Sequence, residues 1–132
     1  VPDGVKMSAI LMIDDDVDFA GLASMHFAKL GYAMTLAHNG KEGLTKARSL
    51  KPDMIFLDIS MPDMNGIEVL RELRAADETS DIPVLVMSGK FFDKEISDLF
   101  TQENNFREFI SKPVDLGYLQ KKVEALLGSK GR

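Results

Sequence analysis

The sequence predicts an α/β domain in which helices cover both faces of a parallel sheet. Short apolar segments alternate along the chain with segments whose apolar residues recur every three or four positions, which is the order of repeated βαβ units. Three of the apolar segments, at 10–13, 54–57 and 84–87, are apolar on both faces, as expected for strands that are buried on both sides. The chain has 132 residues, which is the length of one domain.

Five strands are expected where apolar runs are bounded by turn-forming residues. Pro52 breaks the helical segment before the third strand. Pro83 stands at the first position of the fourth strand, where its missing N–H does little harm. The expected strands span about residues 9–13, 32–37, 53–57, 83–87 and 106–110.

Five helices are expected to alternate with these strands. Asp16 is expected to cap or charge the first turn of the first helix, Gly31 to end that helix, and Asn39-Gly40 to turn the chain into the second. The expected helices span about residues 16–30, 41–49, 66 onward, 92–103 and 115–127. The apolar residues at helical spacing are Phe19, Leu22, Ala23, Phe27 and Leu30 in the first helix and Ile67, Leu70 and Leu73 in the third. In the fourth and fifth helices such residues are expected to face inward, namely Ile96, Leu99 and Phe100 in the fourth and Leu116, Leu119, Val123, Leu126 and Leu127 in the fifth.

Strict alternation of five strands and five helices fits a flavodoxin-like (βα)5 fold, a doubly wound parallel sheet with strand order 2-1-3-4-5. Right-handed crossovers then place the first and third strands side by side at the switch point of the sheet. We expect a single domain over residues 8–127. The residues at 1–7 and 128–132 are expected to be flexible termini.

Composition excludes several classes of function. The net charge of −5 and the absence of a basic block argue against direct nucleic-acid binding. The absence of cysteine excludes disulfides and thiolate chemistry and is compatible with a reducing compartment, and we expect a cytoplasmic location. No apolar run approaches the roughly 18 residues of a membrane span, so no membrane contact is expected.

Polar residues with complementary chemistry stand at the ends of four predicted strands. Asp14-Asp15 follow the first strand, Asp58 the third, Ser88 the fourth and Lys112 the fifth. Because the carboxyl ends of parallel strands meet at one edge of the sheet, where ligands bind, we expect these side chains to converge.

Three carboxylates that lie close together raise one another's pKa, and a hard cation removes that penalty. Oxygen ligands without histidine or cysteine favour Mg²⁺, with Mn²⁺ as a substitute, over zinc. A carboxylate is also a nucleophile that can form an aspartyl phosphate. Lys112 would then neutralise one phosphoryl oxygen and Ser88 would donate a hydrogen bond to another.

At these residues, in the loop 61–66 after Asp58 and at Lys112-Pro113, the chain resembles the receiver domain of two-component response regulators over about residues 8–127. The resemblance implies that Asp58 accepts a phosphoryl group from a sensor histidine kinase or a histidine phosphotransfer protein. It implies that Mg²⁺ is held by Asp15, Asp58 and the backbone carbonyl of Ser60, with Asp14 acting mostly through a bound water.

The resemblance also implies a switch. Lys112 would pair with the phosphoryl group, Ser88 would move toward it, and Phe109 would turn inward as the switch aromatic. A cis peptide bond is implied before Pro113. The surface formed by the fourth helix, the fifth strand and the fifth helix would then bind a downstream protein or a fused output domain, or a second copy of the chain. Such a domain would catalyse only its own phosphotransfer and dephosphorylation and would not be an enzyme in the ordinary sense.

The chain departs from the family pattern at a few places. Asn105-Phe106 replaces the usual Gly-Ala before the fifth strand, and asparagine tolerates left-handed backbone angles there. Gly89 follows Ser88 where alanine is common, and Phe91-Phe92 adds two aromatic residues beside the fourth helix. These departures concern the output surface and leave the phosphorylation chemistry intact.

Several alternatives remain open at this point. A phosphatase of the haloacid dehalogenase type also uses an aspartate and Mg²⁺, but the segment 58–60 lacks the second aspartate of its motif. A pseudo-receiver would bind a partner without phosphorylation. The chain could be a stand-alone regulator or a domain of a longer protein. His26 and His38 lack metal-ligand spacing and are expected to be structural or solvent-facing, and Phe109 could be a plain core aromatic.

Overall fold

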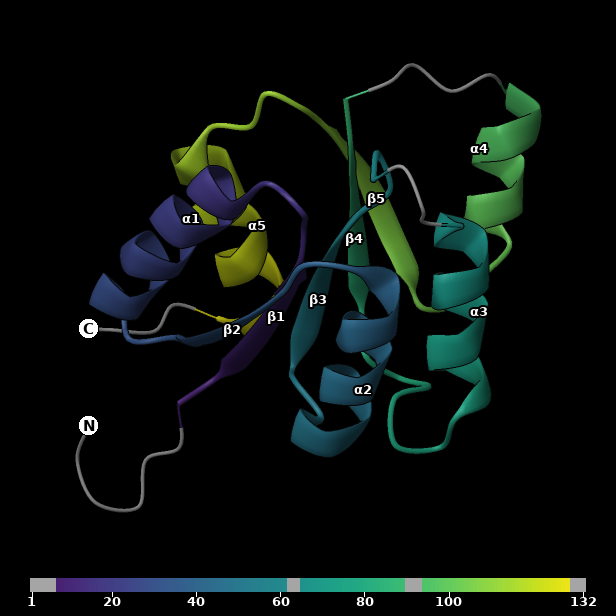
Figure 1. The fold of residues 1–132 in the computed structure, drawn as a ribbon, viewed down its shortest axis with the longest axis horizontal. Coiled ribbons are helices and arrows are strands. Elements are labelled where there is room, and N and C mark those ends of the chain that lie inside the picture. The colour runs from purple at the N-terminus through teal and green to yellow at the C-terminus, as the bar shows by residue number, and fades with distance from the viewer. Residues whose placement is uncertain (1–6, 62–64, 90–93, 129–132) are drawn as a thin grey trace.

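The computed structural model describes residues 7–61, 65–89 and 94–128, with the side chain of Ile96 excepted. Within these residues five strands and five helices alternate, as predicted (Figure 1). Several predictions lie wholly or partly outside the described residues. They concern the flexible termini at 1–7 and 128–132, the loop residues 62–64, the aromatic pair at 91–92 and the start of the fourth helix at 92. The elements are β1 (Ala9–Ile13), α1 (Val17–Lys29), β2 (Ala33–Ala37), α2 (Gly40–Leu50), β3 (Met54–Asp58), α3 (Gly66–Ala75), β4 (Val84–Ser88), α4 (Lys94–Thr101), β5 (Phe106–Ser111) and α5 (Leu116–Leu127).

The sheet is parallel throughout and has the order β2-β1-β3-β4-β5, which confirms the predicted fold. Its register aligns the carboxyl ends of the central strands. Ile13 of β1 lies opposite Leu57 of β3, and Asp58 lies opposite Met87 of β4. The residues that follow β1 and β3 are therefore brought to one edge of the sheet.

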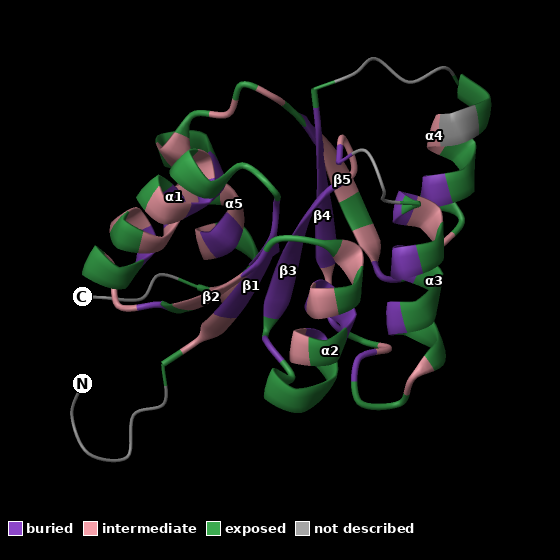
Figure 2. Ribbon diagram, in the orientation of Figure 1, coloured by how far each residue is buried: buried purple, intermediate pink, exposed green. Residues whose placement is uncertain are grey.

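Helices cover both faces of the sheet. Helices α1 and α5 lie on one face and α2, α3 and α4 on the other (Figure 1). The central strands β3 and β4 are buried along their length and β1 is buried after Ala9, whereas the helices expose their outer faces (Figure 2). Successive residues of β3 therefore enter different halves of the core: Ile55 packs with α2 and α3, and Phe56 packs with α1 and α5.

Four helices begin at an aspartate or asparagine whose side chain accepts a hydrogen bond from a backbone amide of the first turn. This arrangement satisfies a donor that the helix itself leaves without a partner. Asp16 has this role at α1, as predicted from the sequence. The other capping residues are Asn39 at α2, Asn65 at α3 and Asp115 at α5.

Three of the apolar residues at helical spacing are exposed, and the prediction that Leu99 and Leu126 face inward is therefore wrong. Leu22 is 59% exposed, Leu99 42% and Leu126 38%. Each stands next to a residue that packs on the core, namely Ala23, Phe100 and Leu127 respectively. Consecutive residues of a helix point about 100° apart, so two neighbours cannot face the sheet equally.

The fifth strand contains a β-bulge at Arg107. Val84 lies opposite Phe106 but Leu85 lies opposite Glu108, so Arg107 is the extra residue. In a regular strand, residues three apart point to opposite faces. The bulge therefore brings Phe106 to the face of the sheet on which Phe109 packs.

Asn105 does not use the left-handed backbone that the sequence allowed. Among the described non-glycine residues, a positive φ occurs only at Lys51. Asn105 is instead buried, and its side-chain amide donates a hydrogen bond of 3.0 Å to the backbone oxygen of Leu70. The asparagine thus ties the start of β5 to α3 by its side chain.

Candidate functional site

The predicted site residues come from four strands that end at the same edge of the sheet. Backbone hydrogen bonds hold these ends together: the amide of Lys112 donates to the oxygen of Ser88 at 2.9 Å, and the amide of Ile59 donates to the oxygen of Met87 at 2.9 Å. The side chains at this edge are thus positioned by the sheet itself. Rigid elements of this kind hold a site more accurately than free loops.

Lys112 joins the carboxylates of two other strands. Its ammonium nitrogen lies 2.8 Å from Oδ2 of Asp14 and 3.0 Å from Oδ2 of Asp58. Asp14 and Asp58 are fully buried, and the Lys112 side chain is 19% exposed. One cation therefore serves two buried anions, which would otherwise carry a large desolvation penalty.

This environment changes the acidity of the groups in it. Burial raises the pKa of the Asp14 carboxyl to about 6, against the lowering effect of the hydrogen bonds from Lys112 and from the amide of Asp16. Burial alone would lower the pKa of Lys112, but its hydrogen bonds to Asp14 and Asp58 outweigh that effect and raise it. The Asp14 carboxyl therefore holds its proton more tightly than an ordinary aspartate does, whereas Lys112 keeps its positive charge.

Asp15 completes a group of three carboxylates. One carboxylate oxygen from each of Asp14, Asp15 and Asp58 lies within 4.8 Å of the others, and Asp15 is exposed to solvent while its two neighbours are buried. Three carboxylates and one ammonium leave two formal negative charges at the edge. An all-oxygen donor set with this charge fits a hard divalent cation such as Mg²⁺.

The loops around Asp58 are fixed by hydrogen bonds to side chains of the site. The amide of Ser60 donates to Oδ1 of Asp58 at 2.8 Å, and the amide of Asp16 donates to Oδ1 of Asp14 at 2.9 Å. The hydroxyl of Ser60 accepts a hydrogen bond of 2.8 Å from the amide of Gly89. The residues after β3 are thereby linked to the residues after β4.

Ser88 lies on β4, the strand next to that of Asp58, and Phe109 lies on β5, one strand farther along the sheet. Ser88 is the buried last residue of β4. Phe109 is half-buried, and its ring centroid lies 5.3 Å from that of Phe100 in α4 and 4.8 Å from that of Phe106. The position of the predicted switch aromatic therefore connects β5 directly to α4. The peptide bond between Lys112 and Pro113 is cis, as the resemblance implied.

Two contacts at this edge were missed by the sequence analysis. The ammonium of Lys112 lies over the ring of Phe19, 5.3 Å from its centroid. Nδ1 of His38 lies 3.0 Å from the backbone oxygen of Asp14, whereas Nε2 of the more distant His26 lies 2.9 Å from Oε1 of Gln120. Phe19 was treated only as a core residue of its helix, since an apolar position at helical spacing carries no other signal.

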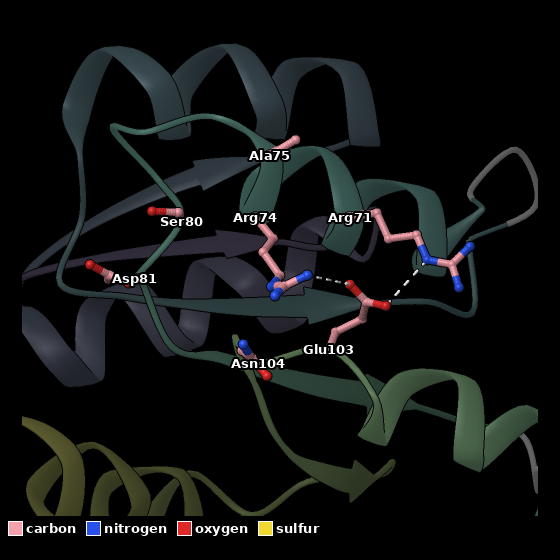
Figure 3. A pocket seen from close by; sticks show the side chains of 7 residues that line it. All are labelled: Arg71, Arg74, Ala75, Ser80, Asp81, Glu103 and Asn104. Carbon is pink, nitrogen blue, oxygen red and sulfur yellow. Dashed lines mark hydrogen bonds and ion pairs between the residues drawn. The ribbon is translucent and has the colours of Figure 1, made fainter.

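A separate cavity of about 490 Å³ lies at the opposite edge of the sheet (Figure 3). The carboxylate of Glu103 lies 3.3 Å from Nε of Arg71 and 4.0 Å from a guanidinium nitrogen of Arg74. Asp81 and Asn104, which also line it, precede β4 and β5 respectively. The cavity is therefore remote from Asp58, and its ion pairs link α3 to the turn before β5.

Among the described residues, no helix is both long enough and apolar enough to span a bilayer.

Comparisons with known proteins agree with this geometry. The family model of the response regulator receiver domain matches residues 10–124. Protein PilH of Pseudomonas aeruginosa is 35% identical over 121 residues, which cover 92% of this chain and 98% of PilH. The chain spans about half the length of other curated relatives, which are transcriptional regulators.

Two solved structures share the fold. The chemotaxis protein CheY4 of Vibrio cholerae has a TM-score of 0.83 at 24% identity, over 92% of this chain and 100% of CheY4. The receiver domain of the sensor histidine kinase PA1611 of Pseudomonas aeruginosa, with a magnesium ion in its active-site cleft, has a TM-score of 0.79 at 22% identity. The match covers 94% of this chain and 100% of the PA1611 receiver domain.

Proposed function

The chain belongs to the response regulator receiver domain family, and from this premise we propose that it is a phosphoacceptor switch of a two-component or phosphorelay system. Asp58 accepts the phosphoryl group from a histidine kinase or a histidine phosphotransfer protein. One observation supports this role above all others: the Asp58 carboxylate lies both 3.0 Å from the Lys112 ammonium and within a group of three carboxylates.

The proposed reaction is a transfer between two side chains. A carboxylate oxygen of Asp58 forms a bond to phosphorus while the phosphorus–nitrogen bond of a phosphohistidine breaks, and the imidazole leaves with the electron pair and takes up a proton. Lys112 donates to one phosphoryl oxygen and the hydroxyl of Ser88 to another. Because such transfer depends mainly on positioning and charge neutralisation, the rigid strand ends supply much of what it requires.

The proposed cation ligands are Asp15, Asp58 and the backbone carbonyl of Ser60, with Asp14 acting mostly through a bound water. Mg²⁺ is the expected ion and Mn²⁺ a substitute, since all of these donors are oxygen atoms. When bound, the ion neutralises carboxylate and phosphoryl oxygens that would otherwise repel one another. The magnesium in the receiver domain of PA1611 supports this assignment.

The proposed output is a change in the surface formed by α4, β5 and α5. Movement of Ser88 toward the new phosphoryl group would open space for Phe109 to turn inward. The contact of Phe109 with Phe100 would carry that movement to α4. Charge added at one residue thus biases a surface with two states.

The remaining features of the proposal follow from the family. The receiver domain spans residues 8–127, lies in the cytoplasm and catalyses only its own phosphotransfer and dephosphorylation. Its altered surface binds a downstream protein or a fused output domain, with a homodimer as an alternative. Direct contact with nucleic acid or membrane forms no part of the proposal.

Intact mass with and without acetyl phosphate and Mg²⁺ tests the proposed function. The wild type should gain about 80 Da, the mass of one phosphoryl group on a carboxylate nucleophile. Asp58→Asn should gain nothing, and Asp81→Asn, an exposed position at the opposite edge of the sheet, should behave as the wild type. A folded wild type that gains no mass would instead indicate docking without phosphorylation.

A further inference from the structure

The Lys112 ammonium is held on two sides by different kinds of group. Two of its three N–H bonds are taken by the carboxylates of Asp14 and Asp58, at 2.8 and 3.0 Å. The ring of Phe19 lies under the same nitrogen, 5.3 Å from nitrogen to ring centroid. A cation within about 6 Å of an aromatic face is attracted by the negative face of the ring.

The segment from β1 to α1 sets the positions of both the anion and the ring. The amide of Asp16 donates to Oδ1 of Asp14 at 2.9 Å, and Oδ1 of Asp16 accepts from the amide of Phe19 at 3.1 Å. Asp16 is thus both the helix cap and the link between the Asp14 carboxylate and the Phe19 backbone. The contacts form a closed circuit from Asp14 through Asp16 and Phe19 to Lys112 and back to Asp14.

Packing fixes the ring against the sheet. Phe19 is half-buried and packs against the part of the core that lies under α1 and α5. The lysine stem has several rotatable bonds, so an unrestrained side chain of this kind has many rotamers. A fixed ring beside the ammonium reduces the number of positions that Lys112 can take and excludes water from one side of it.

We propose that Phe19 is a positioning residue for phosphoryl transfer to Asp58, which holds the Lys112 ammonium at the carboxylate edge by a cation–π contact. The inference rests on the proposed function. When Asp58 is phosphorylated, the phosphoryl oxygens to which Lys112 donates lie farther from the sheet than the carboxylate oxygens do. The ring keeps the ammonium at this edge while its anionic partner changes.

A purely structural role for Phe19 makes a different prediction, because an apolar residue of similar size would then serve equally well. Fluorination of the ring separates the two roles, since it weakens the negative face and changes volume little. We therefore choose mono-, di- and trifluorophenylalanine at position 19. The matched control is the same series at Phe56, which is fully buried and packs against the ring of Phe27.

The rate constant for phosphorylation by acetyl phosphate with Mg²⁺ should fall stepwise across the series at position 19, by about two- to fivefold in total. The rate constant of Phe19→Tyr should stay close to that of the wild type. The rate constant of Phe19→Leu should be lower than that of any variant with an aromatic ring at this position. The series at Phe56 should show no stepwise dependence. A second measurement is independent of the reaction: the ε-methylene protons of Lys112 should show an upfield ring-current shift that Phe19→Leu abolishes.

Equal rate constants across the fluorinated series at position 19, or a Lys112 resonance without the upfield shift, would overturn the inference. If the wild type is still phosphorylated, the proposed function is unaffected by that result. A folded wild type that takes up no phosphoryl group overturns both.

Discussion

The Lys112 ammonium lies 3.0 Å from the carboxylate of Asp58, although 54 residues separate them in the chain. The contact exists because β3 and β5 end at the same edge of the sheet, on either side of β4. The same ammonium also binds Asp14 from β1. Stability and phosphoryl chemistry are therefore expected to depend on one small set of charges.

Lys112→Ala should destabilise the metal-free protein by about 2–4 kcal/mol at neutral pH, because it leaves two buried carboxylates without their cation. Mg²⁺ should restore part of the loss by supplying the missing positive charge. Urea unfolding with and without Mg²⁺ measures both effects. Lys122→Ala is the matched control, since its ion pair with Glu108 at 2.9 Å is about one-third exposed and screened by solvent, so its loss should change stability far less. Equal losses in the two variants would contradict the account.

The raised pKa of Asp14 predicts a specific dependence of stability on pH. The value is about 6 in the folded state against an ordinary 3.8, so the folded protein binds this proton more tightly than the unfolded chain does. The stability that the proton contributes is complete below about pH 4 and is lost as the pH rises through about 6. Between these limits the wild type should lose on the order of 2–3 kcal/mol relative to Asp14→Asn.

The measurement is the free energy of unfolding of both proteins in urea at several pH values without divalent ions. A difference between them that stays constant from pH 4 to pH 7 would show that Asp14 is not the group that titrates. Added Mg²⁺ should stabilise the wild type more at pH 7 than at pH 5, because a bound cation requires ionised carboxylates.

Ser88→Ala should leave phosphorylation of Asp58 detectable but reduce the response of the α4, β5 and α5 surface. The hydroxyl is proposed to follow the phosphoryl group, and alanine has no donor to do so. Amide NMR shifts of the three elements, with and without beryllofluoride and Mg²⁺ as a stable phosphoryl analogue, measure the response. Ser88→Thr keeps the hydroxyl and should retain it. Identical shift changes in Ser88→Ala and wild type would contradict the switch.

Gly66→Ala should destabilise the protein by about 1–3 kcal/mol, because a Cβ at this position would overlap the side chain of Ile59, the residue after Asp58. The control is Gly21→Ala in α1, where a Cβ meets no atom within 4 Å. That change should stabilise by about 0.5–1 kcal/mol, since alanine is the better helix former. Thermal unfolding of the two variants compares them directly, and a shared sign would refute the close approach at Gly66.

The convergence of Asp14, Asp58 and Lys112 could be predicted from the sequence because it depends on topology. Each residue follows a short apolar run, and in a parallel sheet with right-handed crossovers such ends meet at one edge. The prediction needed the order of the strands and not the detailed packing of the helices.

The contacts that depend on packing could not be predicted in the same way. Whether Phe19 reaches Lys112 depends on the rotation of α1 about its own axis, and an apolar residue at helical spacing indicates only burial. The bulge at Arg107 leaves no local signal, yet it decides that Phe106 contacts Phe109. The predictions for Leu99 and Leu126 failed for a related reason, since the pattern alone does not decide which of two apolar neighbours faces the sheet.

Reductive trapping of the phosphorylated residue tests the central claim most directly. Borohydride reduces an aspartyl phosphate to homoserine and leaves free carboxylates unchanged, so peptide mass spectrometry after treatment with acetyl phosphate and Mg²⁺ identifies the acceptor. We predict homoserine at position 58 and at no other aspartate. Conversion of Asp14 or Asp15 instead, or a phosphoryl group on a residue that borohydride does not reduce, would contradict the assignment of Asp58 as the phosphoacceptor.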